Sequence, residues 1–421
     1  MLQTKTLLPG VTLRTFRDTR FKQGCLSFQL VRPMKAEEAA MNALLPSVLL
    51  RGTNAHGDLR RITEHLDSLY GASVGTLVRR VGDYQTIGLY CSFIDDRFAL
   101  PGEQVLQPML AFLRELLLDS PLEEGGFLPS FVESEKRNLI STIESELNDK
   151  RVYAMNRMMK LMCADDPFGM PRLGRKEDVA AIDPKELYAH YRRCLKESAV
   201  HVFYVGSADA EEVAEGLTPI LESLDRDYLD LPPQTGYRPT QPGDHTETMD
   251  VTQGKLCMGF TTGITNRDPS FAAMQVFNTV FGSGMTSKLF MNVREKLSLC
   301  YGIGTGYYGN KGIIALSAGI DFDKEAETRQ EIFRQLALCQ AGDISDEELT
   351  AAKEAISSGL RSTHDTPGAI EGYYATAALS GMAMTPDRYL EAIASVTKDQ
   401  VVACANRVAL HTTYFLKGVT E

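Results

Sequence analysis

The chain has 421 residues, of which 43% are hydrophobic and 24% charged, and its formal net charge is −11. The length predicts two to three domains, and the composition is that of a folded globular protein rather than a disordered or fibrous one. The acidic balance argues against a nucleic-acid partner, because phosphate binding needs a concentrated Lys and Arg surface.

The N-terminal stretch MLQTKTLLPGVTLRTFRD, residues 1–18, has no long apolar run and contains Pro9 and Gly10. We therefore expect neither a secretory signal nor a membrane span, and we expect a cytoplasmic protein. The eight cysteines are scattered without a Cys-x-x-Cys pair, which indicates reduced core thiols rather than disulfides or a metal cluster.

The first half of the chain alternates apolar segments, turns and helical patterns. Its longest helical stretch covers residues 131–163, where the methionines are interpreted as core filler. Five landmarks follow one another in this half: ALLPSVLLRGT (43–53), SLYGASVGT (68–76), YQTIGLYCSFID (84–95), AIDPKELYAHYRRCL (181–195) and HVFYVG (201–206). The third and fifth are typical of strands, and the fourth is an amphipathic helix with Asp183 as its N-cap.

Residues 228–247, YLDLPPQTGYRPTQPGDHTE, are rich in Pro, Gly and polar residues and lack hydrophobic periodicity. This composition predicts a linker between two domains.

The second half repeats the landmarks in the same order. They are MQVFNTVFGSG (274–284), SLCYGIGT (298–305), GIIALSAGID (312–321), SVTKDQVVACANRVAL (395–410) and TTYFLKG (412–418). Such a series indicates a duplication. We predict an α+β fold with two homologous half-domains, 1–227 and 248–421, each a mostly antiparallel sheet packed with helices.

The block FGSGMTSKLFMNVREKLSLCYGIGTGYYGNKG, residues 281–312, combines a Gly-rich turn, Ser-x-Leu-Phe, Arg-Glu-Lys and Leu-x-Tyr. It resembles the C-terminal half-domain signature of the pitrilysin/insulinase family of zinc peptidases, and the resemblance extends over nearly the whole chain. In that family the Arg and Tyr contact the peptide substrate, which implies that Arg294 and Tyr301 are substrate-binding residues here.

The same resemblance implies an inverted zinc motif, His-x-x-Glu-His, on a helix just before the turn Gly52-Thr53, and a third ligand on the next long helix. Two histidines four apart on a helical face would hold the ion, and the Glu would act as general base. The corresponding positions here are Ala43, Pro46 and Ser47 and, for the third ligand, Thr142. None can do this chemistry, Pro46 is expected to distort the helix, and Glu144 near Thr142 leaves a residual ligand open.

No other catalytic pattern replaces the missing one. None of the seven histidines forms a His-x-x-Glu-His or His-Glu-x-x-His motif; we interpret His65 as a surface residue and His201 as structural. A nucleophile-elbow Gly-x-Ser-x-Gly is also lacking. The run at Gly302, Gly304 and Gly306 is not followed by Lys-Ser/Thr, so close approach of a substrate backbone explains it better than a phosphate.

The leading hypothesis is a catalytically silent, peptide-binding subunit of a heterodimeric zinc peptidase. This chain would carry no cofactor, while an active zinc-peptidase paralogue would hold the zinc and the chain would bind peptide by strand addition. Two alternatives stay open: a structural homodimer without proteolysis, and a zinc hydrolase with unrecognised ligands such as Glu144 and His65. Arg294 could instead pair with a carboxylate on its own helix, and Tyr301 could be a core aromatic.

Overall fold

The computed structural model describes residues 2–231 and 236–419. The contacts divide the chain into two compact units, the first and the second unit. The first unit comprises Met1–Glu144, Pro171–Pro232 and His364–Thr376, and the second comprises Ser145–Met170, Pro233–Thr363 and Ala377–Glu421. Each unit thus includes a short segment from the other half of the sequence.

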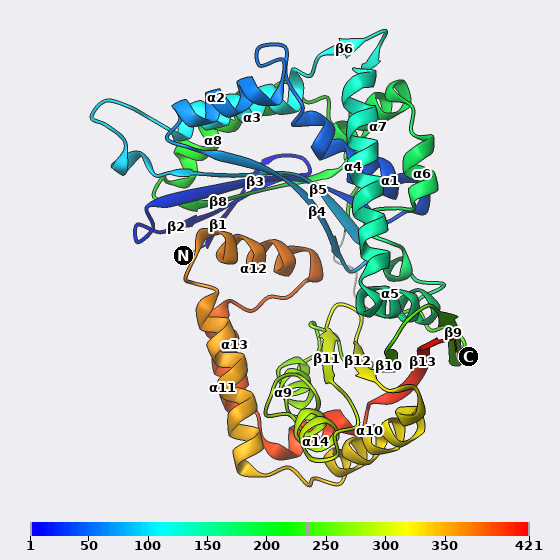
Figure 1. Cartoon of the computed structure of the whole chain (residues 1–421). Coiled ribbons are helices and arrows are strands. Elements are labelled where there is room, and N and C mark those ends of the chain that lie inside the picture. The colour runs from blue at the N-terminus through cyan, green and yellow to red at the C-terminus, as the bar shows by residue number, and fades with distance from the viewer. Residues whose placement is uncertain (1, 232–235, 420–421) are drawn as a thin grey trace. The chain divides into compact units, whose positions relative to one another are not determined.

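The first unit is built on a six-stranded sheet (Figure 1). The strands, in sheet order, are β1 (Leu2–Leu8), β2 (Val11–Arg17), β8 (Ala199–Gly206), β3 (Gln23–Pro33), β5 (Tyr84–Ile94) and β4 (Ser73–Val81). All neighbours are antiparallel except β2 and β8, which are parallel.

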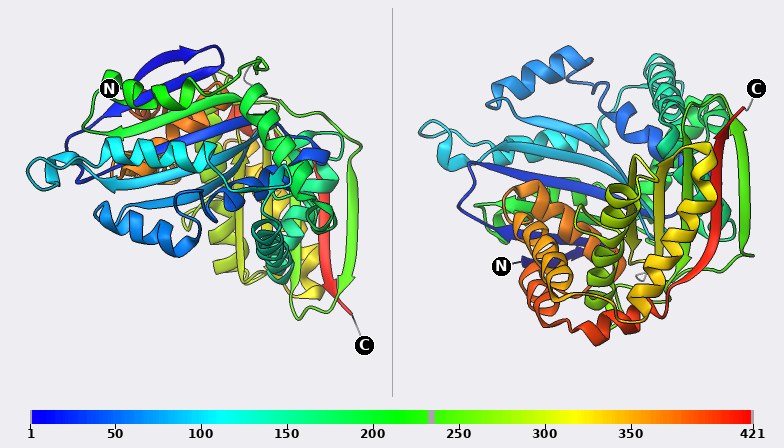
Figure 2. Two further views of the ribbon diagram at one scale, coloured as in Figure 1. Left: turned by 90° about the horizontal axis from the view of Figure 1, so that it is seen from above. Right: turned by 60° about the horizontal axis from the view of Figure 1, so that its bottom comes forward.

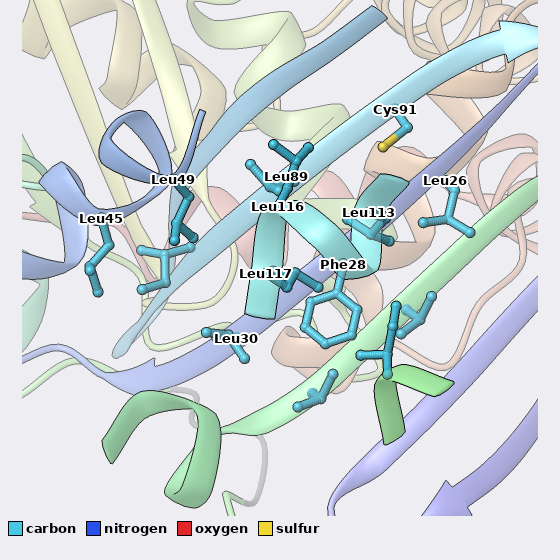
Figure 3. Close-up of a cluster of buried hydrophobic side chains, with 14 of the residues drawn as sticks. Leu26, Phe28, Leu30, Leu45, Leu49, Leu89, Cys91, Leu113, Leu116 and Leu117 are labelled. Atoms are coloured by element: carbon cyan, nitrogen blue, oxygen red, sulfur yellow. The ribbon is translucent and has the colours of Figure 1, made fainter. Parts of the chain in front are cut away.

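Helices cover one face of this sheet (Figure 1). They are α1 (Ala36–Leu49), α2 (Leu59–Ser68), α3 (Leu106–Leu118), α4 (Pro129–Asn148), α6 (Lys176–Ala181), α7 (Pro184–Glu197) and α8 (Ala210–Leu221). Strand alternation directs Leu26, Phe28 and Leu30 of β3 into the core with leucines of α1 and α3, as Figure 3 shows. Burial of these side chains is the main source of stability for the unit. Short connecting elements are η1 (Asp96–Phe98), β6 (Leu122–Glu123) and β7 (Gly126–Phe127).

The opposite face of β3 carries polar side chains. Ser27 and Gln29 are buried there, and both donate hydrogen bonds to Glu371 at the start of α12 (Pro367–Ser380). The segment His364–Thr376 therefore completes the first unit although it comes from late in the chain.

The second unit has a five-stranded sheet, seen from two further sides in Figure 2. Its strands, in sheet order, are β11 (Gly302–Tyr308), β12 (Ile313–Ile320), β10 (Gly254–Thr261), β13 (Ala409–Gly418) and β9 (Gly243–Met249). Only β13 and β9 are parallel. The order β4-β5-β3-β8-β2 of the first sheet is thus repeated as β11-β12-β10-β13-β9. The predicted α+β fold with a duplicated, mostly antiparallel sheet is confirmed.

The helices of the second unit include one contributed by the first half of the chain. The helical elements are α5 (Lys150–Met162), η2 (Pro167–Gly169), α9 (Phe271–Phe281), η3 (Leu289–Lys296), η4 (Phe322–Lys324), α10 (Glu325–Gln340), α11 (Asp346–Ser362), α13 (Pro386–Ser395) and α14 (Lys398–Ala405). Met158 and Met162 of α5 are fully buried with Cys257 and Tyr414, which confirms that these methionines fill a core.

The helical stretch predicted at 131–163 is interrupted. Asp149 lies between α4 and α5 and accepts hydrogen bonds from the backbone N–H groups of Arg151 and Val152, so a new helix begins at Lys150. The predicted linker, 228–247, includes 232–235, which lie outside the described residues, and its last residues, 243–247, begin β9. The division into halves 1–227 and 248–421 stays a prediction about homology.

Within the described residues, none of the helices has both the length and the apolar character that crossing a bilayer requires.

Candidate functional site

The positions at which the resemblance implies zinc ligands lie on α1 and α4. Ala43 and Pro46 are buried in α1, and Ser47 is half-buried. The helix continues through Pro46 to Leu49, so the expected distortion does not end it. Neither Ala43 nor Pro46 has a side-chain lone pair to offer a metal, and a neutral Ser is not among the ligands that zinc prefers.

Thr142, the third implied position, is exposed on α4, and its hydroxyl donates a hydrogen bond of 2.9 Å to the carbonyl of Asn138. Glu144 pairs with Lys176 at 3.3 Å. In the described part of the chain, no group of three or more His, Cys, Asp or Glu side chains could hold a metal ion. These residues therefore do not fit zinc, and Glu144 with His65 gains no support as an unrecognised ligand set.

A guanidinium lies in the turn just after the end of α1. Arg51, four residues after Ser47, places Nη1 3.4 Å from Oε1 of Glu135 on α4. Its guanidinium also lies 5.8 Å from the ring centroid of Phe131. A fixed positive charge at this place disfavours a divalent cation, and it neutralises Glu135, a carboxylate that the sequence reasoning did not consider.

His65 lies on α2, and its ring is tilted against that of another histidine. Its ring centroid is 4.6 Å from that of His56 and 4.7 Å from that of Phe112. His56 Nδ1 is 2.7 Å from Oε1 of Glu115, which also accepts a hydrogen bond from Thr53. Burial, followed by the charge of His56, lowers the pKa of His65. This cluster anchors the Gly52-Thr53 turn, and sequence reasoning missed it because its members are far apart in the chain.

Cys194, His190 and Asn42 resemble a thiol-protease triad in composition. The Cys194 Sγ is 3.3 Å from His190 Nε2, which lies 2.8 Å from Asn42 Oδ1. All three are buried, and burial raises the pKa of the Cys194 thiol to about 12. The thiol is therefore protonated and inaccessible, and the arrangement is structural.

Arg294 lies on an unusual helix. The segment Leu289–Lys296 is a π-helix, η3, and the Leu297 N–H donates to the carbonyl of Asn292, five residues earlier. The guanidinium lies 4.7 Å from the Phe290 ring centroid and 3.4 Å from a Glu295 oxygen, with 40% of the side chain exposed. The alternative in which Arg294 pairs on its own helix thus describes one of its contacts, and the exposed part is free to meet a ligand.

Tyr301 follows the π-helix and precedes the edge strand β11. Its backbone N–H donates to the carbonyl of Gly319, and its hydroxyl donates to Asp321 at 2.9 Å. That hydrogen bond raises the pKa of the Tyr301 hydroxyl. The residue is 62% exposed, so the alternative of a core aromatic is wrong. Ser298, between Arg294 and Tyr301, has φ of 51°, a strained conformation for a residue with a side chain.

A cleft of about 470 Å³ opens beside Tyr301. Its lining comprises Arg151, Gln253, Lys255, Tyr301, Gly302, Ile303, Gly304, Ser317 and Gly319, all from the second unit. Of these residues, Tyr301, Gly302 and Gly304 were singled out from the sequence, whereas Gly319, Arg151 and Lys255 were not. Only the register of β10, β12 and β11 brings Lys255 next to Gly319 and Gly302.

A family model described as "Peptidase M16 inactive domain" matches residues 181–356, a range that contains both Arg294 and Tyr301. A Bacillus subtilis protein named "Probable inactive metalloprotease YmfF" is 30% identical over 409 residues, which are 97% of this chain and 96% of that protein. The chain belongs to the M16 peptidase family. This confirms the resemblance to the pitrilysin/insulinase family found in the sequence.

Two further likenesses extend over most of the chain. The crystal structure of a conserved protein from Enterococcus faecalis V583 superimposes with a TM-score of 0.93 at 25% identity, and the match covers 100% of this chain and 99% of that one. A Rickettsia bellii protein named "Uncharacterized zinc protease" is 25% identical over 297 residues, which are 68% of this chain and 69% of that protein. Relatives of this M16 chain therefore include proteins named as zinc proteases and one named as inactive.

Proposed function

We propose that this M16 protein is a catalytically silent, peptide-binding subunit of a heterodimeric zinc peptidase that acts in the cytoplasm. An active paralogue would hold the zinc and cleave the peptide, and this chain would close the chamber and orient the substrate. The relative named as an inactive metalloprotease supports the silent role of this chain. The relative named as a zinc protease supports zinc chemistry in a homologous chain.

The observation that carries the proposal is a contrast between the two units. The first unit has Ala43, Pro46 and Ser47 where ligands would be required. The second keeps Arg294 and Tyr301 exposed at the two ends of a strained segment. π-Helical turns and left-handed non-glycine residues cost free energy and are concentrated at functional sites. A structural scaffold that binds no peptide would have no use for such a strained segment.

The geometry suggests a role for each residue. The Arg294 guanidinium can donate charge-assisted hydrogen bonds to peptide carbonyls or a terminal carboxylate. The Tyr301 hydroxyl donates to Asp321, which leaves its oxygen lone pairs to accept from a peptide N–H. Strand β11 is at the edge of its sheet, and the Thr305 N–H already donates to Gly282, so a peptide would pair with the part of β11 nearer Tyr301.

A structural homodimer is the second candidate, and the exposed Arg294 and Tyr301 speak against it. The third, a zinc hydrolase with unrecognised ligands, has no metal-ligand cluster within the described residues to support it.

The test starts with co-purification from the native cell, followed by mass spectrometry. The proposal expects a similar-sized M16 chain that carries His-x-x-Glu-His. Recovery of this chain alone would instead favour the structural homodimer.

Replacing both contact residues then tests the peptide-binding role. In the mixed complex, Arg294→Ala with Tyr301→Ala should reduce kcat/KM for peptide hydrolysis at least about 100-fold, because two hydrogen-bonding groups are lost. Assembly, followed by gel filtration, should be unchanged. The matched control is Lys296→Ala, which removes an exposed cation from the same π-helix. Unchanged hydrolysis by the double variant would remove the role assigned to Arg294 and Tyr301.

A further inference from the structure

The floor of the cleft beside Tyr301 is free of side chains at Gly302 and Gly304, whereas the Gln253 side chain lies over Gly319. The antiparallel register places Gly302 opposite Gly319 and Gly304 opposite Ser317, so these four residues share one face of the sheet. A methyl group built on Gly302 would meet nothing within 4 Å, and on Gly304 it would meet only the Gly282 carbonyl oxygen at 3.7 Å. The surface is therefore shaped to admit a chain or side chain close to the backbone.

Two cations line the same cleft. Lys255 lies opposite Gly319 on the next strand, and Arg151 is exposed at the start of α5. The Lys255 ammonium donates to the Gln253 side chain, and the charges of Arg151 and Lys255 both act on the nearby Asp149 carboxylate. Burial lowers the pKa of Lys255, which means that the ammonium lacks full compensation for its lost hydration.

The neighbouring carboxylates indicate which of the two clefts beside the cations can accept an anion. A second cleft of about 520 Å³ shares Arg151, Gln253 and Lys255 with the first, and it also contains Asp149 and Asp250. The Asp149 carboxylate is occupied by the N–H groups that begin α5. These two carboxylates disfavour an anion in the second cleft. The side facing Gly302 and Tyr301 has cations and no carboxylate in its lining.

We propose that the cleft is a specificity subsite for a carboxylate of the bound peptide, with Arg151 and Lys255 as the recognising cations. The inference rests on the proposed function, because the peptide must first lie along β11. Its side chains alternate between the two faces of the sheet, and those level with Gly302 and Gly304 leave the sheet on the face where Lys255 lies. The strand order is β11-β12-β10, so a peptide paired with β11 is about three strand spacings, roughly 14 Å, from Lys255. The long side chains of Lys255 and of a peptide Glu therefore meet only by extending toward each other over Gly302 and Gly319. The carboxylate is either an Asp or Glu side chain or the C-terminus of the peptide.

The test measures binding of three fluorescein-labelled peptides to the full chain by fluorescence anisotropy. All are nonapeptides of Ala, Ser and Thr with one central variable residue. The first has Glu and a C-terminal amide, the second has Gln and an amide, and the third has Gln and a free carboxylate. We expect a Kd about five- to tenfold lower for one of the two carboxylate peptides than for the neutral one, since partly exposed ion pairs with hydrogen bonds contribute modestly. Which peptide gains identifies the source of the carboxylate.

Substitutions then assign the preference to its residues. Arg151→Gln and Lys255→Gln should each reduce the preference at least twofold and together should abolish it. Because Arg151 is exposed, its variant keeps the fold even where a Lys255 variant does not. Lys160→Gln is the matched control, since it removes an exposed cation from the same helix outside the cleft, and it should keep the full preference.

The outcomes separate this inference from the function on which it rests. Equal binding of all three peptides, or an unchanged preference in the Arg151 and Lys255 variants, overturns the subsite and leaves peptide binding intact. Binding of none of the three overturns the subsite together with the proposed peptide-binding role.

Discussion

At the scale of single residues, Glu371 is a buried carboxylate of the first unit with several hydrogen-bond donors around it. It is buried, and it accepts hydrogen bonds from Ser27 at 2.8 Å, from Gln29 at 2.7 Å and from both terminal nitrogens of Arg79 at 2.9 and 3.0 Å. A buried carboxylate is tolerated only when its lone pairs are satisfied in this way. Glu371 thereby fixes the start of α12 to the sheet.

Replacing Glu371 with Ala should leave three donors without their acceptor and destabilise the first unit by about 3 kcal/mol. In calorimetry this corresponds to a Tm lower by roughly 6–12 °C. Glu354→Ala, at an exposed position on α11, serves as the control and should shift Tm by less than about 2 °C. Equal Tm values for the two variants would show that the α12 contact contributes little.

His190 is a buried histidine held neutral by its partners. Nε2 lies 2.8 Å from Asn42 Oδ1, and Nδ1 lies 2.8 Å from an Arg193 nitrogen, so Nδ1 must accept and Nε2 must donate. Burial lowers the pKa of His190 to about 4. A second proton would face the Arg193 N–H groups.

This histidine makes stability depend on pH. Its pKa is lower in the folded state than in the unfolded chain, so unfolding takes up a proton between pH 6.5 and about 4. Stability is complete above pH 6.5 and falls by up to about 1.4 kcal/mol per pH unit below it. Urea titrations at pH 7 and 5 should show a smaller loss for His190→Gln than for the wild type. An identical loss in both proteins would mean that other groups carry the acid sensitivity.

At the scale of elements, the sheets depend on close backbone approach. Gly88 of β5, a strand paired on both sides, lies opposite Gln29 of β3 and Leu77 of β4. A Cβ atom at Gly88 would lie only 1.9 Å from the carbonyl oxygen of Phe28, and a strand backbone cannot move aside as a flexible side chain can.

Gly88→Ala should therefore destabilise the first unit by about 2–3 kcal/mol, as an overpacked core does. Gly75→Ala is the matched control, because Gly75 lies on the adjacent strand β4 and a Cβ there meets nothing within 4 Å. The control should be neutral or stabilising by up to about 1 kcal/mol. Thermal unfolding of both variants checks the difference, and similar Tm values would contradict it.

At the scale of the whole molecule, local sequence patterns predicted the strands and the duplication. They did not predict which distant residues contact one another. The paired landmarks at 84–95 and 312–321 are β5 and β12, and those at 201–206 and 412–418 lie in β8 and β13. A duplication repeats local sequence, so a single chain reveals it. The exchange of Ser145–Met170 and His364–Thr376 between units depends on contacts between distant residues, which periodicity does not encode.

The same reasoning explains what was missed at the candidate site. The motif around Arg294 and Tyr301 was visible because it is contiguous, whereas Arg151 and Lys255 meet only through sheet register and the placement of α5. The π-helix was also not predicted, because residues 289–296 have ordinary helix-forming composition. Both omissions concern features that tertiary structure imposes on a local sequence.

We propose that this chain contributes to peptide hydrolysis only beside an active M16 partner. Peptidase rates should be measured for the purified chain, for the co-purifying family member and for their equimolar mixture. This chain alone should show no zinc-dependent hydrolysis, and the rate of the mixture should be far above the sum of the separate rates. Chelator-sensitive hydrolysis by this chain alone would show instead that it is itself a metallopeptidase.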